Sequence, residues 1–192
     1  MKAERLAQLV NELHSLRSDQ ITLEGDDPSD EEEYRMYAPA SGDAIQDAEG
    51  RCGRPYPQSY RVFLRLYNGW LGFWPDWSLV GVSREDNQDM YDDIQLNVDL
   101  LPDVVGEEEM NELVEKERSD PDLILLTNHM ILATDFNGSF LLFDSNRTTG
   151  GDEPEIAWVQ NLQHVERRWS NFEALLRAAI EDTNLELAEL RQ

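Results

Sequence analysis

The segment 49–77 constrains the fold more than any other part of this chain, because it joins turn residues to an amphipathic helix. Pro57 fixes its own φ and has no N–H, which suits the first turn of a helix. Asn68 and Gly69 tolerate a left-handed backbone, so we expect the helix to end there. Between these limits, apolar and aromatic side chains recur at i, i+3, i+4 and i+7 and share one face: Tyr60, Phe63, Leu64 and Tyr67. The segment is therefore predicted to be the nucleus of the core.

Aromatic side chains at positions 70, 73, 74 and 77 follow this helix. Gly72 and the pair Pro75-Asp76 favour turns, which bring some of the rings towards the surface. Tryptophan offers a large, rigid area and is enriched at the hot spots of interfaces. Two interpretations stay open: all four rings belong to the core, or Trp74 or Trp77, on either side of Asp76, anchors a partner.

A set of residues in this segment resembles the signature of the SUKH superfamily: Glu49, Gly53, Pro57-x-x-Tyr60-x-x-Phe63-Leu64 and Asn68-Gly69. That superfamily includes fungal cell-wall regulators and bacterial immunity proteins that neutralise polymorphic toxins. The segments 131–144 and 171–173 resemble its central hairpin and the start of its final helix. The resemblance implies one SUKH-like domain over residues 1–192, with its core at about 44–180, and a role in binding. The chain departs from the family in Tyr56, where an aliphatic residue is usual, and in an acidic insert over 24–43.

The remaining patterns predict several helices and strands. Apolar residues at helical spacing predict helices over 2–17, 44–53 and 106–118, and a capping box with Ser170 as the cap predicts a helix towards the C-terminus. Asn137-Gly138 is a strong signal for a two-residue hairpin. Short apolar runs predict strands over 78–82, 123–127, 130–134, 139–143 and 155–160. Together they predict an α+β fold: a mostly antiparallel sheet with helices packed on one side and helices at both termini.

Cys52 is the single cysteine, so no internal disulfide can form, and a reducing compartment fits. It falls on the apolar side of the helix over 44–53, so we expect a small buried side chain rather than a nucleophile. The first twenty residues lack the apolar core of a secretory signal, and no apolar run approaches the ~20 residues that a membrane span needs. We therefore expect a cytoplasmic protein.

Acidic residues outnumber basic ones by 40 to 16, which gives a formal net charge of −24. This balance argues against binding nucleic acid or an anionic membrane, because both require Lys and Arg. It suits a basic protein partner, whose encounter with this chain would be steered electrostatically. The alternative is that the charge only keeps the protein soluble.

Two segments concentrate this charge. Residues 24–33 carry seven carboxylates and no basic residue, which predicts a solvated loop; a cation site, a mimic of nucleic-acid phosphates and a contact for a basic toxin are the functional alternatives. Residues 84–99 are predicted to be a second acidic loop. We expect four carboxylates of this loop to steer a basic partner: Asp86, Asp89, Asp92 and Asp93.

The sequence offers few candidates for catalysis. His129, Asp135 and Asp144 lie in or near the predicted hairpin, so a histidine–carboxylate pair is conceivable. Strand residues alternate between faces, however, and Asp at a turn commonly accepts hydrogen bonds from its own backbone. We find no nucleophile elbow, no glycine-rich phosphate loop and no metal spacing of histidines. We therefore predict a protein that is not an enzyme and has no catalytic residue, metal or cofactor.

Three functions remain as hypotheses. The first is an immunity protein that binds and neutralises a cognate bacterial toxin, which the charge predicts to be basic, such as a nuclease. The second is a non-catalytic intracellular scaffold or regulator that uses the same surface on a host protein. The third is an enzyme or metal-binding protein that uses His129, Asp135 and Asp144.

Overall fold

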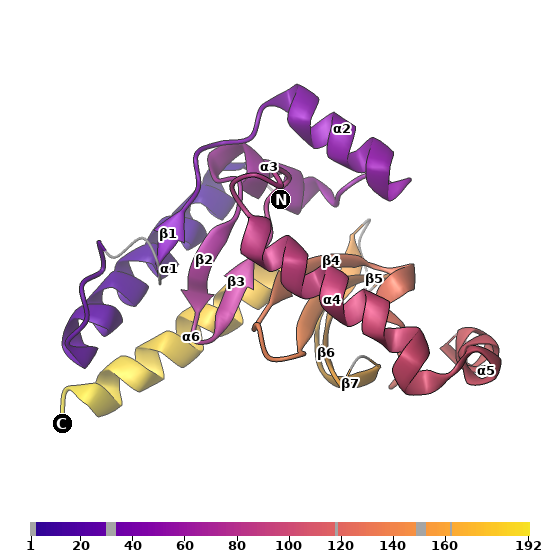
Figure 1. The fold of residues 1–192 in the computed structure, drawn as a ribbon. Helices are drawn as coiled ribbons and strands as arrows, with labels where there is room; N and C mark the ends of the chain where they lie inside the picture. The colour runs from indigo at the N-terminus through magenta and orange to yellow at the C-terminus, as the bar shows by residue number, and fades with distance from the viewer. Residues whose placement is uncertain (1–2, 30–33, 118, 149–152, 162) are drawn as a thin grey trace.

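The computed structural model describes residues 3–29, 34–117, 119–148, 153–161 and 163–192. It shows one antiparallel sheet, whose strands lie side by side in chain order (Figure 1). The strands are β1 (Arg35–Met36), β2 (Trp70–Trp74), β3 (Trp77–Leu79), β4 (Met130–Thr134), β5 (Phe140–Thr148), β6 (Pro154–Gln160) and β7 (His164–Trp169). The helices are α1 (Ala3–Glu24), α2 (Gly42–Cys52), α3 (Gln58–Leu66), α4 (Gln88–Val105), α5 (Glu107–Glu117), the 3₁₀ turn η1 (Leu126–Asn128) and α6 (Phe172–Leu190). The predicted α+β class and the antiparallel sheet are confirmed.

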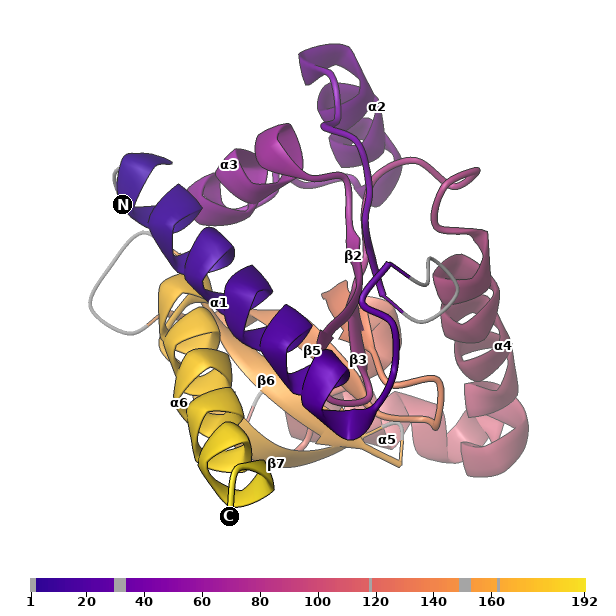
Figure 2. The ribbon, with the colours of Figure 1, turned by 90° about the vertical axis from the view of Figure 1, so that its left-hand side faces the viewer.

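The terminal helices α1 and α6 pack side by side along one face of the sheet (Figure 2). Their apolar stripes meet α3 and the inner side chains of the central strands in one continuous core. α1 is longer than the predicted 2–17, and Ile21 in its added turn belongs to this core. Since an isolated helix in water is marginal, the mutual burial of α1 and α6 is what stabilises both.

α3 is the centre of this core, as the sequence predicts. Tyr60 and Phe63 are fully buried, and their rings meet the edge of Phe172 from α6. The Tyr60 hydroxyl donates a hydrogen bond to the carbonyl of Val80, so the buried phenol has a partner. α3 ends at Leu66, next to the predicted Asn68-Gly69 stop.

The turn after α3 docks against the segment that follows β3. Oδ1 of Asn68 accepts the N–H of Val82 at 2.7 Å, and Oδ1 of Asn87 accepts the N–H of Gly81 at 3.0 Å. Asn87 also donates to the carbonyl of Asn68 at 3.1 Å. Gly69 has φ +104°, a conformation that side chains rarely adopt. Backbone and side chains thus meet here without room for an added methyl group.

The structure adds a layer that the sequence analysis did not expect, because α4 covers the opposite face of the sheet (Figure 2). β5 alternates between the two layers: Leu141 and Phe143 face α1, α3 and α6, whereas Phe140 and Leu142 face the side of α4. Ile94 and Val98 are the residues of α4 that pack against this second cluster. The sheet is therefore buried on both faces at β5 and β6.

The prediction of a loop over 84–99 is wrong, because most of this segment is the first part of α4. Its many aspartates suggested a solvated loop, yet its apolar residues follow helical spacing. They are Met90, Tyr91, Ile94, Val98 and Leu101. The Pro102 ring lies in the last turn and does not prevent the helix from reaching Val105.

Two further predictions about strands are corrected. Residues 123–127 form no regular strand; Leu123 makes one isolated bridge to His164, and η1 follows. A continuous apolar run indicates burial, which Ile124 and Leu125 show, but does not specify strand geometry. β7 was not predicted, because its sequence HVERRW is dominated by charged residues, as is common in an edge strand.

Smaller differences concern caps, loops and the acidic insert. Asn171, rather than Ser170, caps α6, since its Oδ1 accepts the N–H of Ala174. Cys52 is exposed and not buried as predicted, because α2 turns that position outward. β1 lies within the insert over 24–43, and β5 extends to Thr148, beyond the predicted strand over 139–143. Residues 149–152 and residues 30–33 of the acidic segment lie outside the described residues.

The close contact at Gly81 gives a testable prediction. A Cβ at this position would lie 1.9 Å from the carbonyl oxygen of Asn68, so Gly81→Ala should lower the free energy of unfolding by about 2 kcal/mol or more. Gly50→Ala is the matched control: Gly50 lies in α2, and a Cβ there would have open space around it, with no neighbouring atom within 4 Å. It should raise stability by about 0.5–1 kcal/mol. Urea denaturation followed by circular dichroism measures both, and equal effects would contradict the docking described here.

Candidate partner-binding surface

The outward side of α4 is strongly acidic. From residue 85 to residue 105 the chain has seven carboxylates and no Lys or Arg. Burial of Met90 and Leu101 fixes which side of the helix faces the protein. Four exposed carboxylates lie at helical spacing, with intervals of three, seven and four residues, along the other side: Asp89, Asp92, Asp99 and Asp103. The sequence predicted the first two of these and missed the last two, because the helix was not recognised.

Two exposed leucines lie between these carboxylates. Leu96 is 58% exposed and Leu100 is 43% exposed, although most leucines of this chain are buried. They follow Asp92 at i+4 and i+8, so they belong to the same side of α4. The acidic surface of α4, defined here as Asp89, Asp92, Leu96, Asp99, Leu100 and Asp103, therefore combines charge with apolar area. Helical spacing of the apolar residues is the sequence signal that could have identified it.

Asp93 differs from the other predicted carboxylates because it turns towards the sheet. It accepts a hydrogen bond from the hydroxyl of Thr134 at the end of β4 and one from the amide of Asn97. Thr134 is fully buried. Asp93 therefore fixes α4 on the sheet rather than presenting a charge to solvent.

A groove of about 880 Å³ lies beside the first turn of α4. Asp86 and Asp89 form one wall, and Arg35 and Tyr37 from the edge of the sheet form the other. The Arg35 guanidinium lies 4.4 Å from the centre of the Tyr37 ring. Phe136, at the tip of the β4–β5 hairpin, is half exposed and has φ +56°, which a bulky residue rarely adopts. The groove thus brings two predicted site residues next to an exposed aromatic ring.

The structure separates the predicted tryptophans from this acidic surface. Trp74 and Trp77 are 8% and 7% exposed, and their rings contact Trp169 and Trp158. Asp76 is exposed at the β2–β3 turn, with φ +65°. Burial lowers the pKa of Arg17 in α1, and the negative charge of Asp76 is one of those that oppose this shift. The predicted residues therefore form two groups, with the tryptophans supporting the sheet and the carboxylates near α4.

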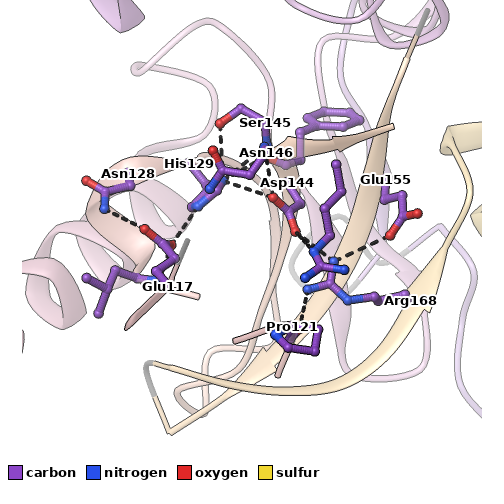
Figure 3. Close-up of polar contacts among 12 residues, drawn as sticks. Glu117, Pro121, Asn128, His129, Asp144, Ser145, Asn146, Glu155 and Arg168 are labelled. Carbon is purple, nitrogen blue, oxygen red and sulfur yellow. Dashed lines mark hydrogen bonds and ion pairs between the residues drawn. The ribbon is translucent and has the colours of Figure 1, made fainter. Parts of the chain in front are cut away.

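Two of the three candidates for catalysis, His129 and Asp144, lie in a buried polar cluster between α5 and the sheet (Figure 3). Nε2 of His129 lies 2.8 Å from Glu117, which also accepts the N–H of Leu125 and the amide of Asn128. Nδ1 accepts the N–H of Ser145 at 3.2 Å, so the proton of a neutral ring is on Nε2. The sequence analysis did not connect Glu117 with His129, because no local pattern joins residues twelve positions apart in different elements.

The two aspartates of that hypothesis have other partners. Asp144 lies 4.0 Å from His129 but only 2.7 Å from Arg168, which itself donates to the carbonyl of Pro121. Asp135 accepts the N–H groups of Asn137 and Ser139, as expected of Asp at a turn. The three residues therefore do not form one site.

A serine, a histidine and a glutamate are nevertheless adjacent in this cluster. The hydroxyl of Ser145 lies 3.4 Å from Nδ1 of His129, which already accepts the shorter backbone hydrogen bond. The oxygen of that hydroxyl accepts a hydrogen bond from Arg54. Since a general base needs a free lone pair aimed at the hydroxyl, this geometry favours a structural link over an activated nucleophile. The described residues also contain no group of three acidic, histidine or cysteine side chains that could hold a metal ion.

Comparison with known families gives one match. The model of the SMI1 / KNR4 family (SUKH-1) matches residues 39–178 of this chain, which is more than half of its length. The matched range contains α2 to α5, β2 to β7 and the first part of α6, and it confirms the resemblance predicted from the segment 49–77. No curated protein matches the chain. Each helix of the described residues is too short or too polar to cross a membrane.

The buried cluster gives a prediction about acid stability. Burial alone raises the pKa of Glu117, but hydrogen bonds from His129, Leu125 and Asn128 outweigh it and bring the pKa below its ordinary value. A lowered pKa in the folded state adds stability above the unfolded pKa, and this stability is lost as the pH falls through the folded pKa. Glu117→Gln should therefore cost about 1–3 kcal/mol at pH 7. It should also lose less stability than the parent protein between about pH 5 and pH 3.

Urea titrations across this pH range measure both effects. Glu112→Gln is the matched control, since Glu112 lies on the same helix and is largely exposed beside Lys116. It should change stability by less than about 0.5 kcal/mol. Parallel pH curves for Glu117→Gln and the parent protein would show that Glu117 carries no such linkage.

Proposed function

We propose, from the premise that this chain belongs to the SMI1 / KNR4 family (SUKH-1), that it is an immunity protein which binds and neutralises a basic bacterial toxin. Members of this family are commonly immunity proteins and generally not catalytic. The observation that carries the proposal is the acidic surface of α4. Its four exposed aspartates, in a segment (85–105) that has no Lys or Arg, suit a partner rich in Lys and Arg.

Charge and apolar area have separate roles in this proposal. The exposed aspartates speed the encounter, because long-range attraction raises the association rate. Leu96 and Leu100 supply the apolar contact that slows dissociation, as the buried centre of an interface does. Asp93 takes part indirectly, since its bond to Thr134 holds α4 in place.

The groove beside α4 extends this surface. A lysine or arginine of the toxin could enter between Asp86 and Asp89 and place its aliphatic stem against Phe136. Long basic side chains bury their stems against apolar groups while the charged end stays near carboxylates. We assign this groove to the recognition of one basic side chain.

A nuclease is the class of toxin that this surface fits best. Nucleases bind phosphates through Lys and Arg, and a row of carboxylates along a helix presents negative charge to the same groups. Binding there would cover the toxin's nucleic-acid site and inhibit it directly. Trp74, Asp76 and Trp77 remain predicted contacts of a second area, in which Asp76 is the exposed member.

The test is binding to the toxin domain encoded in the adjacent gene, measured by surface plasmon resonance at low and high salt. The acidic surface is neutralised by Asp89→Asn, Asp92→Asn, Asp99→Asn and Asp103→Asn in one variant. At low salt its association rate should fall about tenfold or more, and the difference should shrink at high salt. The same variant should protect cells poorly against the toxin.

A control variant removes equal charge from exposed positions elsewhere: Glu12→Gln, Asp47→Asn, Glu181→Gln and Glu189→Gln. It should change the association rate much less, because only distant charges are lost. An equal fall in the association rate of both variants would contradict the proposal that the toxin binds the acidic surface of α4. Absence of binding by the parent protein would redirect the search towards a host partner and the regulator hypothesis.

The leucines give a separate prediction. Leu96→Ser and Leu100→Ser together should raise the dissociation rate by about tenfold while the association rate changes little, because apolar contacts form after the encounter. Both side chains are exposed, so the unfolding free energy should stay within about 0.5 kcal/mol. An unchanged dissociation rate would remove the leucines from the interface.

A further inference from the structure

A second concave region lies on the inner side of α4, away from its acidic surface. One pocket, of about 350 Å³, is enclosed by the α2–α3 connection, α4 and β4. A neighbouring pocket of about 490 Å³ extends over the start of α3 and the middle of β5. Both are lined by Arg54, Tyr56 and Met130. Arg54 therefore lies at the border between the two pockets.

Arg54, like Arg17 and Arg51, bonds to a neutral group of the protein. Arg61, Arg168 and Arg177 each pair with a carboxylate, whereas no described carboxylate lies within ion-pair distance of Arg54. Its recorded partner is the hydroxyl of Ser145, at 3.0 Å. The chain around it carries four arginines between residues 50 and 75 and no acidic residue. Arginines are therefore concentrated near Arg54, although the whole protein carries −24.

The carboxylates nearest to the pocket already have partners within the protein. Glu117 accepts three hydrogen bonds, and Asp144 is held by Arg168. His129 lines the pocket with its ring bound to Glu117. An anion beside Arg54 would thus meet a cation and a hydroxyl donor rather than a free acidic group.

Aliphatic side chains line much of the smaller pocket. Its walls include Ile94 and Val98 of α4 and Ile131 of β4, all partly buried, with Met130 and Leu126 beneath them. The volume lies at the lower end of the range for small-molecule sites, which are apolar with a few fixed polar groups. Such a shape accepts an unbranched chain or one ring and excludes larger groups.

The Arg54 corner is rigidly held. Oε1 of Glu49 accepts the N–H of Tyr56 at 2.8 Å and pairs with Arg61, which fixes the connection between α2 and α3. Pro55 and Pro57 restrict the same connection further. A preformed site loses less conformational entropy when a ligand binds.

We propose that the smaller pocket binds the apolar chain of a carboxylate, against Ile94, Val98 and Ile131. The carboxylate itself lies on Arg54, at the border with the neighbouring pocket that Ser145 lines. A free medium-chain acid and the C-terminal residue of a peptide both present this chemistry. The site goes beyond the proposed immunity function, because it lies on the other side of α4 from the acidic surface and recognises the opposite charge.

The test is calorimetric titration of the full chain with octanoate, and with octanamide as the neutral analogue of equal size. Octanoate should bind saturably with one site per chain, and octanamide at least about tenfold more weakly, because the amide cannot form the charged pair with Arg54. An acetylated Gly-Leu-Leu peptide, with a free or an amidated C-terminus, distinguishes the two sources of the carboxylate. Binding of the peptide acid without octanoate would assign the site to a chain terminus.

Matched variants separate this site from general effects of charge. Arg54→Gln should weaken octanoate or the peptide acid about tenfold, whereas Arg65→Gln, an exposed position on α3 with the same charge change, should not. Val98→Gln should weaken the acid as well, by placing a polar amide among the apolar walls. Circular dichroism checks that the variants fold. The proposal fails if neither acid binds, if the amides bind equally well, or if Arg54→Gln binds like the parent protein.

Discussion

The docking of the Asn68-Gly69 turn against Gly81 and Val82 is the constraint on which the rest of the structure depends. The buried side chain of Asn68 accepts the N–H of Val82, and that of Asn87 accepts the N–H of Gly81. Asn87 also donates to the carbonyl of Asn68. Asn68 follows α3 directly, and Asn87 directly precedes α4. The helix at the centre of the core and the helix with the acidic surface are therefore fixed by the same few hydrogen bonds. Because these groups are buried, losing one partner leaves another polar atom without water or protein contact.

Charge is distributed in this molecule by element rather than evenly. α4 concentrates carboxylates on its outward side, while the α2–α3 connection and α3 concentrate arginine. The α2–α3 connection and α4 both border the pocket on the inner side of α4, so an arginine and the acidic surface lie on different sides of one helix. The net charge of −24 describes neither region, and it is the local arrangement that decides which partner each side attracts.

How far the sequence predicts this structure depends on whether the signal is local. α3 was predicted because Pro57, the spacing of Tyr60, Phe63 and Leu64, and Gly69 agree with one another. Asn137-Gly138 correctly predicted the β4–β5 hairpin but not its loop, because residues 135–139 separate the paired Thr134 and Phe140. α4 was missed because its aspartates suggested a solvated loop, although Ile94 and Val98 follow helical spacing. The pairing of Glu117 with His129 and the position of Arg54 between two pockets depend on tertiary contacts, for which the chain carries no local pattern.

The two layers that share β5 divide the chain into positions with very different freedom to vary. Phe140 to Phe143 are packed from both sides, so a change there disturbs one core or the other. The outward positions of α4 contact neither core, and substitutions at such surface positions usually alter stability by no more than about 0.5 kcal/mol. A lineage could therefore exchange the charges and leucines of α4 to follow a changing partner while the sheet beneath stays the same. The fold thus separates the buried positions of the sheet, which must be retained, from the outward positions of α4, which can change.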